Sequence, residues 1–288
     1  MTQPVDTLLH RLDIETLDRD LFRGKSPADG RPRVFGGQVL GQALVAASRT
    51  VEAGRIAHSL HAYFLRPGDP SIPILYEVDR IRDGRSFTTR RVRAIQRGEA
   101  IFSVSVSFQV DEPGLEHQAP MPEAPPPLSL PSNEERMQKL QHTHARLFEF
   151  LLHLERPIEQ RDADPLDPLA PRPHTGLRRI WFRAHGTLPD DPMLHQCVLA
   201  YASDLSLLDS ALFHHGVTWF DPRLIAASLD HAIWFHRPFR ADAWLLYAME
   251  SPSASGARGF NLGRVYSEDG RLVASVAQEG LMRMVEKR

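Results

Sequence analysis

The sequence contains a single cysteine and no long apolar run. One thiol, Cys197, rules out an intramolecular disulfide and any CxxC metal or redox site, and this suits a reducing compartment. No run of about 18 apolar residues is present to span a bilayer. The start MTQPVDTLLHRLD also lacks the charged and apolar stretches of a signal peptide. We therefore expect a cytoplasmic protein without membrane insertion.

An excess of charge of either sign is also missing. The 34 basic and 36 acidic residues nearly cancel, so nothing indicates nucleic acid or an anionic membrane surface as a partner. The GxSxG elbow, the P-loop, the HExxH zinc motif and the GxGxxG dinucleotide motif are absent. His214 and His215 would point apart on a helix, with no carboxylate or cysteine spaced to join them. We expect no metal, no cofactor and no nucleic-acid partner.

Proline is concentrated in one segment that follows the strand-like sequences of the first half. Residues 113–131 carry seven prolines and little apolar periodicity, a composition that favours an extended connector. We therefore predict an N-terminal half over residues 1–112, a linker over 113–131 and a C-terminal half over 132–288. A candidate amphipathic helix at 133–155 and a Pro-rich stretch at 157–173 look like additions around the second half.

The first half has the pattern of one helix followed by long strands. Val39, Ala43, Ala47 and Val51 recur every four residues, which predicts a helix. Its apolar character indicates burial against a sheet. Strand-like segments separated by Gly and Pro turns follow it, and they are HSLHAYFL, PILYEVDRIRDG, FTTRRVRAIQRG and AIFSVSVSFQV. A buried helix followed by a meander of strands is an α+β layout.

The second half repeats this order. Asp191 and Pro192 form an N-cap and first-turn pair for a helix that we expect to continue through MLHQCVLAYASDLSLLDSALFHH and to stop at Gly216. Strand-like segments come next, namely ASLDHAIWFHR, AWLLYAMES, GFNLGRVYSEDG and RLVASVAQEGLMRM. FLRP at 64–67 recurs as FHRP at 235–238, and Tyr76 recurs as Tyr247, both 171 positions later. We infer an internal duplication.

Asp204 is the most unusual polar residue of the second helix. It shares one expected helix face with Cys197, Tyr201 and Leu208, and that face should pack on the sheet. A carboxylate buried there without a partner would cost several kcal/mol. Two readings follow from the pattern: a structural carboxylate that caps amides or pairs with an arginine, and a functional acid or base.

Two further polar residues lie on strands of the second half. Alternation along the last strand puts Gln278 on the same apolar face as Ala274 and Val276. Such a glutamine is either a hydrogen-bonded core amide or a functional group. Ser228 opens the predicted strand ASLDHAIWFHR, where a lone serine is usually structural or solvated.

Several long motifs make the sequence similar to a known family. They are RVFGGQVLGQAL, HSLHAYFLRPGD, DGRSFTTRRVRAIQRGEAIFSVSVSFQ, HAIWFHRPF, WLLYAMESPSASGARGF and DGRLVASVAQEG. In this order they resemble the acyl-CoA thioesterase II family, from about Leu12 to Met284. The resemblance implies a double hot-dog fold, in which each half wraps a curved antiparallel sheet around a long helix and the two sheets join edge to edge.

The resemblance also implies cofactor-free hydrolysis of fatty acyl-CoA to free fatty acid and CoA. In that family an aspartate on the second helix, a serine or threonine, and a glutamine activate a water, and the matching positions here are Asp204, Ser228 and Gln278. Ser228 keeps the hydroxyl where the family often has threonine. The predicted helix of the first half holds no acid, so we expect one active site per chain.

Two weaker expectations accompany the resemblance. His58, in the HSLH segment, is a candidate for lining the substrate pocket, although a polar residue at a strand end is the ordinary alternative. Hot-dog sheets expose edges and faces that generally pair, so we expect a homodimer or homotetramer.

Two other functions are compatible with the same fold. One is a non-catalytic sensor or carrier of acyl-CoA, which would not need three polar groups on apolar faces. The other is an enzyme of the enoyl-CoA hydratase type, whose histidine and neighbouring carboxylate on the helix are not found in this sequence. Release of free thiol from acyl-CoA, compared with loss of enoyl absorbance, separates the three.

Overall fold

The first half of the chain packs a central helix against long strands. The structure, a computed structural model, describes residues 4–27, 30–141 and 156–286. The elements of this half are α1 (Pro4–Leu12), β1 (Glu15–Asp18), β2 (Leu21–Gly24), α2 (Gly36–Ser48), β3 (Arg55–Phe64), β4 (Ile74–Asp83), β5 (Phe87–Gln96) and β6 (Glu99–Val110). The predicted helix and the four predicted strands are confirmed as α2 and β3 to β6. The sequence patterns did not predict α1, β1 and β2.

The second half repeats the helix and the long strands. Residues 111–126 form no helix or strand, and they lead into the short 3-10 helix η1 (Pro127–Ser129) and α3 (Asn133–Gln141). The elements that follow are β7 (Ile158–Asp162), β8 (Arg178–Ala184), α5 (Pro192–Ser203), α6 (Asp209–His214), β9 (Leu224–Ser228), β10 (Asp230–Phe235), β11 (Leu245–Ser255), β12 (Arg258–Ser267) and β13 (Leu272–Met284). The helix predicted at 133–155 begins as α3, and from residue 142 onward it lies outside the described residues.

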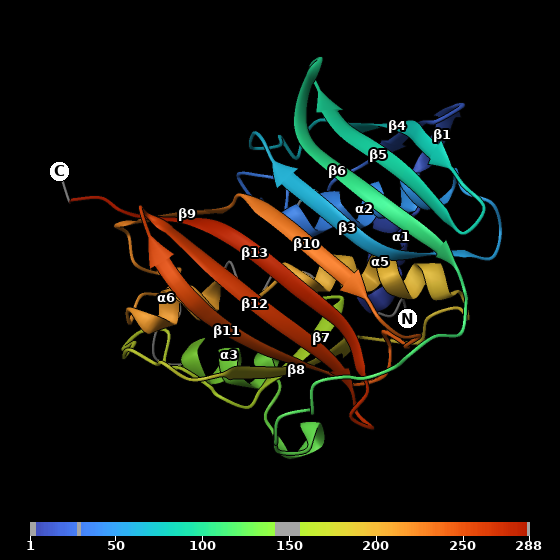
Figure 1. Ribbon diagram of the computed structural model, residues 1–288. Coiled ribbons are helices and arrows are strands. Elements are labelled where there is room, and N and C mark those ends of the chain that lie inside the picture. Colours follow the sequence, from blue (N-terminus) through green and yellow to red (C-terminus); the bar gives the residue numbers. More distant parts are fainter. Residues whose placement is uncertain (1–3, 28–29, 142–155, 287–288) are drawn as a thin grey trace.

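Within the described residues, thirteen strands form a single sheet in front of α2 and α5 (Figure 1). The order is β1-β2-β4-β5-β6-β3-β10-β13-β12-β11-β8-β7, and β9 pairs with β13 off this path. The two halves meet where β3 runs antiparallel to β10, from the pair Tyr63 and Asp230 to the pair Ser59 and Trp234. One continuous α+β sheet with a helix for each half is the arrangement that a double hot-dog fold requires.

The two central helices approach each other closely across the junction. A β-carbon on Gly37 would lie 2.3 Å from the carbonyl oxygen of Tyr201, and one on Gly41 would lie 3.2 Å from that of Cys197. These glycines are one turn apart on α2 and face carbonyls one turn apart on α5, so the lack of side chains permits backbone contact. In the described part of the chain, no helix is both long and apolar enough to cross a membrane.

The sheet of the second half has apolar side chains packed on both faces. Phe182, Tyr247 and Val265 belong to the core between sheet and helices, whereas their strand neighbours point the other way. The neighbours form a second cluster that includes Trp181, Trp244, Leu246 and Tyr266, packed against Met121, Ala124 and Leu130 of the connecting segment. Trp181 Nε1 and the Tyr266 hydroxyl donate to the carbonyls of Pro125 and Pro120, respectively. The connector therefore lies along the outer face of the second half.

The second long helix is shorter than predicted. Asp191 caps its start as expected, because its side chain accepts from the amide of Met193 at 3.0 Å. The helix ends at Ser203, however, with Asp204 as its C-cap, and a turn over residues 204–208 separates it from α6. The prediction of one helix through to His215 was wrong. At this point tertiary contacts hold the chain: the Ser203 carbonyl accepts from the hydroxyl of Tyr247, and the Asp204 side chain accepts from Ser228 and Gln278.

The predicted strand ASLDHAIWFHR is likewise two strands. β9 ends at Ser228 and β10 begins at Asp230, so Ser228 closes a strand instead of opening one. The side chain of Asp230 accepts from the amide of Glu279 at 2.8 Å, and the carbonyl of Leu229 accepts from Phe64 of β3. At this break the chain leaves its sole partner β13 and enters the space between β13 and β3.

Candidate active site

Three polar side chains from separate parts of the second half meet at one point. Asp204 Oδ1 accepts hydrogen bonds from Ser228 Oγ at 3.1 Å and from Gln278 Nε2 at 2.6 Å. Gln278 Nε2 also donates to Ser228 Oγ at 2.8 Å. The structure thus brings together all three residues that were singled out from the sequence.

Backbone positions explain why these side chains converge. Asp204 is the residue that ends α5, and its backbone amide donates to the carbonyl of Ala202. Ser228 pairs with Gly280 in the antiparallel ladder between β9 and β13, two residues from Gln278 on the same strand face. Gln278 is fully buried, as the alternation of β13 predicts. The end of one helix therefore projects its carboxylate onto two neighbouring strands.

The three side chains use most of their donors in hydrogen bonds to one another. Gln278 Nε2 has two protons, and they go to the carboxylate and to the serine hydroxyl. The single proton of the serine hydroxyl goes to Asp204 Oδ1. One acceptor of the group remains without a hydrogen-bond partner, the buried Oε1 of Gln278. It is available to a water or a substrate group.

The first half contributes the start of α2 to this group, which sequence reasoning missed. The backbone amide of Gly37 donates to the Asp204 carboxylate. A β-carbon on Gly36 would lie 2.6 Å from Asp204 Oδ2 and 2.9 Å from Phe64. The positive end of a helix dipole therefore faces the carboxylate, and the lack of a side chain at Gly36 allows Oδ2 to pack closely against the start of the helix. The motif FGGQ contained the signal, since paired glycines at a helix start allow close approach of another group.

Burial has a strong effect on the acid itself. It raises the pKa of the Asp204 carboxyl from its usual value near 4 to about 6, although hydrogen bonds from Gln278, Ser228 and Gly37 act in the opposite direction. Burial raises the pKa of the nearby Tyr247 hydroxyl, and the negative charge of Asp204 raises it further. Near neutral pH the carboxylate is ionised but is a stronger base than an exposed aspartate.

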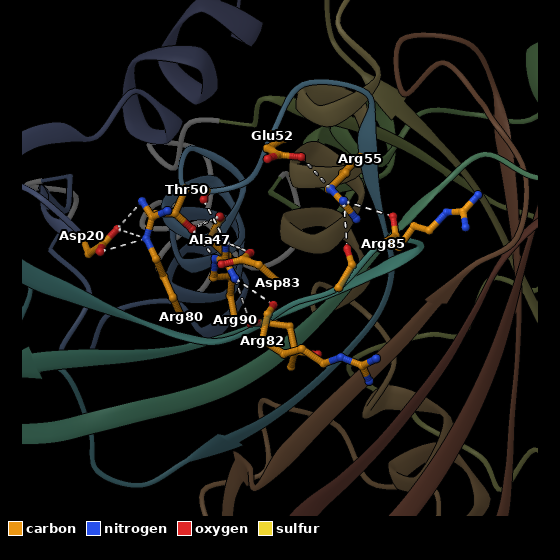
Figure 2. A network of polar contacts seen from close by, with 12 residues as sticks. Asp20, Ala47, Thr50, Glu52, Arg55, Arg80, Arg82, Asp83, Arg85 and Arg90 are labelled. Atoms are coloured by element: carbon orange, nitrogen blue, oxygen red, sulfur yellow. Dashed lines mark hydrogen bonds and ion pairs between the residues drawn. The ribbon is translucent and has the colours of Figure 1, made fainter.

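The other end of α2 is held by a buried arginine (Figure 2). Arg90 of β5 is 1% exposed. Its Nε donates to Thr50 Oγ1 at 2.9 Å, and its Nη2 donates to the Thr50 carbonyl at 3.0 Å and to Asp83 Oδ1 at 2.5 Å. A cation at the C-terminal end of a helix is favourable for its dipole. The helix whose N-terminus faces Asp204 is thereby fixed to the sheet at its far end.

A cavity of 360 Å³ adjoins the end of α5. Tyr201, one turn before Asp204, and Leu205, directly after it, both line the cavity. The wall comes from both halves and combines apolar side chains, such as Ile158, Phe213 and Trp219, with charged ones, namely Arg31, Arg136, Arg156, Arg178, Asp162 and Asp209. Small-molecule sites commonly combine apolar walls with a few polar groups.

His58 lies away from the three converging residues. It stands on β3, where its Nε2 is 2.8 Å from Ser107 Oγ and its ring packs edge-on against Phe87. Tyr63, at the other end of β3, pairs with Asp230 beside the site, and five residues of extended strand span about 17 Å. The geometry does not bring His58 to Asp204. Its role in the pocket stays a prediction.

Among the described residues, no group of three or more His, Cys, Asp or Glu side chains is arranged to hold a metal ion. The groups that meet at Asp204 are a carboxylate, a hydroxyl and an amide. Such groups can accept a proton from water and fix its orientation.

Comparison with known proteins gives matches in both halves. A family model described as acyl-CoA thioesterase matches residues 151–281, and one described as acyl-CoA thioesterase N-terminal domain matches residues 25–109. The chain is 40% identical over 286 residues to acyl-CoA thioesterase 2 of Haemophilus influenzae, covering 99% of this chain and 100% of that protein.

Solved structures are similar over nearly the whole chain. An acyl-CoA thioesterase II from Mycobacterium marinum matches with a TM-score of 0.80 and 44% identity, over 98% of this chain and 99% of that one. A conserved protein of unknown function with a hot-dog fold from Alicyclobacillus acidocaldarius matches with a TM-score of 0.77 and 19% identity, over 99% and 100%. The latter supports the fold alone. Fold and sequence together define a double hot-dog thioester hydrolase. The chain belongs to the acyl-CoA thioesterase II family, and the predicted family and fold are confirmed.

Proposed function

We propose that this protein hydrolyses fatty acyl-CoA to free fatty acid and CoA with a water activated by Asp204. The observation that carries the mechanism is the carboxylate with a raised pKa, held by Ser228 and Gln278 and facing the N-terminus of α2. No cofactor and no metal takes part in the proposed reaction. The three residues of the second half form one site per chain.

The reaction is a direct attack of water on the thioester. Asp204 accepts a proton from water as the water oxygen bonds to the carbonyl carbon. The resulting oxyanion collapses, the carbon–sulfur bond breaks, and the CoA thiolate receives the proton that Asp204 holds. Ser228 and Gln278 keep the carboxylate fixed, and the buried Oε1 of Gln278, which has no hydrogen-bond partner, can accept a hydrogen bond from the water. The dipole of α2 favours negative charge near its start.

The cavity next to Asp204 supports an acyl-CoA substrate. Its wall includes apolar side chains such as Ile158, Phe213 and Phe220, together with four arginines and two aspartates. We propose medium to long fatty acyl chains as substrates, which places the enzyme in fatty acid metabolism. Rates measured across a series of chain lengths test this preference, and a maximum at acetyl-CoA would contradict it.

Two alternatives keep the same fold. A sensor or carrier of acyl-CoA would need no activated acid, and an enoyl-CoA hydratase would use a histidine beside a carboxylate. His231 is buried beside Ser203, the residue before Asp204, but burial lowers the pKa of His231 to about 3. A histidine that stays neutral and lacks an open path to substrate is a poor proton shuttle at neutral pH. The structure therefore favours hydrolysis.

We expect EDTA-treated protein to release free thiol from fatty acyl-CoA without added metal or nucleotide. A thiol-reactive dye follows the reaction, and absorbance of an enoyl-CoA substrate follows any hydration in parallel. Protein that binds acyl-CoA but releases no thiol at any chain length would be a sensor or carrier. Loss of enoyl absorbance without thiol release would identify a hydratase.

Ser228 and Gln278 should contribute less than the acid that they hold. Ser228→Ala removes one hydrogen bond to the carboxylate, so we expect kcat to fall by about 5- to 30-fold, or about 1–2 kcal/mol. Ser228→Thr keeps the hydroxyl and should be nearly silent. Gln278→Ala should resemble Ser228→Ala, and the double variant should cost less than the sum because both residues hold one oxygen. A trapped acyl-serine in mass spectrometry would instead make Ser228 a nucleophile.

We also propose a homodimer or homotetramer in the cytoplasm. The outer face of the sheet exposes Tyr63, Trp234, Phe260 and Leu262 near the junction of the halves, and Tyr63 is 62% exposed. Apolar side chains gathered on one face favour association. Light scattering of the purified protein measures the mass, and a monomer would contradict the proposal. Fractionation of cells tests the compartment.

We further propose the division into a first half at 1–112, a linker at 113–131 and a second half at 132–288. The pairing of β3 with β10 supports two halves that depend on each other. Residues 1–112 alone would expose the β3 edge and should aggregate. A soluble fragment that unfolds cooperatively would indicate independent domains.

A further inference from the structure

The residue before Asp204 is held by two side chains from the sheet. Ser203 is fully buried at the end of α5. Its Oγ donates to the carbonyl of Ala200 at 3.0 Å and lies 2.9 Å from His231 Nε2. Its carbonyl accepts from the hydroxyl of Tyr247 at 3.2 Å. Strands β10 and β11 therefore fix both the side chain and the backbone of Ser203.

Both contacts have a fixed donor direction. The one hydroxyl proton of Ser203 goes to Ala200, so Ser203 Oγ accepts from an Nε2–H of His231. Burial keeps the pKa of His231 low, and the imidazole is neutral. Burial also raises the pKa of Tyr247 well above its usual value, so its hydroxyl remains a donor. Neither contact changes over the pH range in which Asp204 titrates.

The end of α2 in the first half can be compared with the end of α5 in the second half. α2 ends at Ser48 as α5 ends at Ser203, and the residue after Ser48 is Arg49 instead of an acid. His231 corresponds to Leu60 at the spacing of 171 residues. In the first half, Ser48 Oγ is buried and has no hydrogen-bond partner. The histidine is thus present only in the copy that carries the acid.

We propose that His231 and Tyr247 are positioning residues, which hold Asp204 in its reactive place by fixing Ser203. This inference rests on the proposed function, in which Asp204 is the base. The Tyr247 ring packs directly against Gly263, where a β-carbon would lie 2.3 Å from the ring. This packing holds the tyrosine hydroxyl at the Ser203 carbonyl. A carboxylate displaced by a fraction of an ångström would lose alignment with the water and the thioester.

The first test compares two equivalent tyrosines. Tyr76 is the counterpart of Tyr247 in the first half; it is fully buried and donates to Gln42 Oε1 at 2.6 Å, away from the site. Tyr247→Phe and Tyr76→Phe each remove one buried hydroxyl, so they should lower the melting temperature comparably. Only Tyr247→Phe should lower kcat, by about 3- to 10-fold, with KM within about twofold.

A second test uses His231 and does not depend on the tyrosine variants. His231→Leu copies the residue of the first half and should lower kcat by about 3- to 10-fold. His231→Gln, whose amide can again donate to Ser203 Oγ, should restore most of it. Wild-type protein without thiol release would refute the proposed function. Wild-type turnover with unchanged kcat in Tyr247→Phe and His231→Leu, or an equal loss of kcat in Tyr76→Phe, would overturn the positioning role alone.

Discussion

Asp204→Asn should lower kcat by about 100-fold or more while leaving the protein folded. Asparagine has nearly the same volume, and its amide oxygen can still accept from Ser228 and Gln278, but it is not a base. General-base catalysis is typically worth about 10²- to 10⁴-fold. Steady-state thiol release measures the loss. Circular dichroism and size-exclusion chromatography show whether the variant keeps the native fold. Undiminished turnover would remove Asp204 from the mechanism.

The pH profile gives an independent readout of the same residue. The carboxylate must be ionised to accept a proton, and its pKa is raised to about 6. We therefore expect kcat/KM of the wild type to rise about tenfold per pH unit below 6 and to level off above it. The residual activity of Asp204→Asn should lack this step. A wild-type profile that is flat from pH 4.5 to 7.5 would exclude Asp204 as the titrating base.

The same substitution should stabilise the fold at neutral pH. Because the folded-state pKa of Asp204 is raised from about 4 to about 6, ionisation costs the folded state stability as pH increases through this window. Two pKa units correspond to at most about 3 kcal/mol. Partial exposure of the residue and the lost bond from the Gly37 amide reduce the gain from asparagine to about 1–2 kcal/mol. Urea unfolding at pH 4 and pH 7 should show the gain only at pH 7.

The sequence predicted which residues form the site, but it did not predict where the helix that carries Asp204 ends. Asp204 and Gln278 stand out because polar residues on apolar faces are costly and need partners, and alternation along β13 is enough to bury Gln278. The end of α5 at Ser203 was not predictable from local propensity. At that end Ser203 contacts Tyr247 and His231, which lie on strands distant in sequence.

Other differences arise from tertiary contacts of the same kind. The contribution of the first half depends on how α2 and α5 cross, and no periodicity in either helix shows that crossing. Strand β7, with the sequence IEQRD, carries too little apolar alternation to be recognised, and it is stabilised by pairing with β8 at the sheet edge. The catalytic roles of Asp204, Ser228 and Gln278 remain predictions for the variants above.

Gly37→Ala should impair both stability and activity because it forces α2 away from α5. The added methyl would lie 2.3 Å from the Tyr201 carbonyl oxygen, which is backbone and cannot swing aside. Such overpacking costs about 1–3 kcal/mol or more, against about 1 kcal/mol gained from helix propensity. We expect a lower melting temperature. Displacing α2 also weakens the bond from the Gly37 amide to Asp204, which normally lowers the pKa of the acid.

Gly41→Ala is the matched control for this effect. It lies one turn further along the same face of α2, gains the same helix propensity, and meets the Cys197 carbonyl at 3.2 Å and the flexible end of Leu12 at 3.0 Å. Its melting temperature and kcat should stay near those of the wild type. For Gly37→Ala we expect kcat to fall by about 10-fold or more, the value of a hydrogen bond to a charged group. Its activity midpoint should also move above pH 6, because loss of the amide leaves the ionised carboxylate less stabilised. Equal melting temperatures, turnover and pH midpoints for the two variants would show that the helices tolerate a methyl at either contact and that the start of α2 does not tune Asp204.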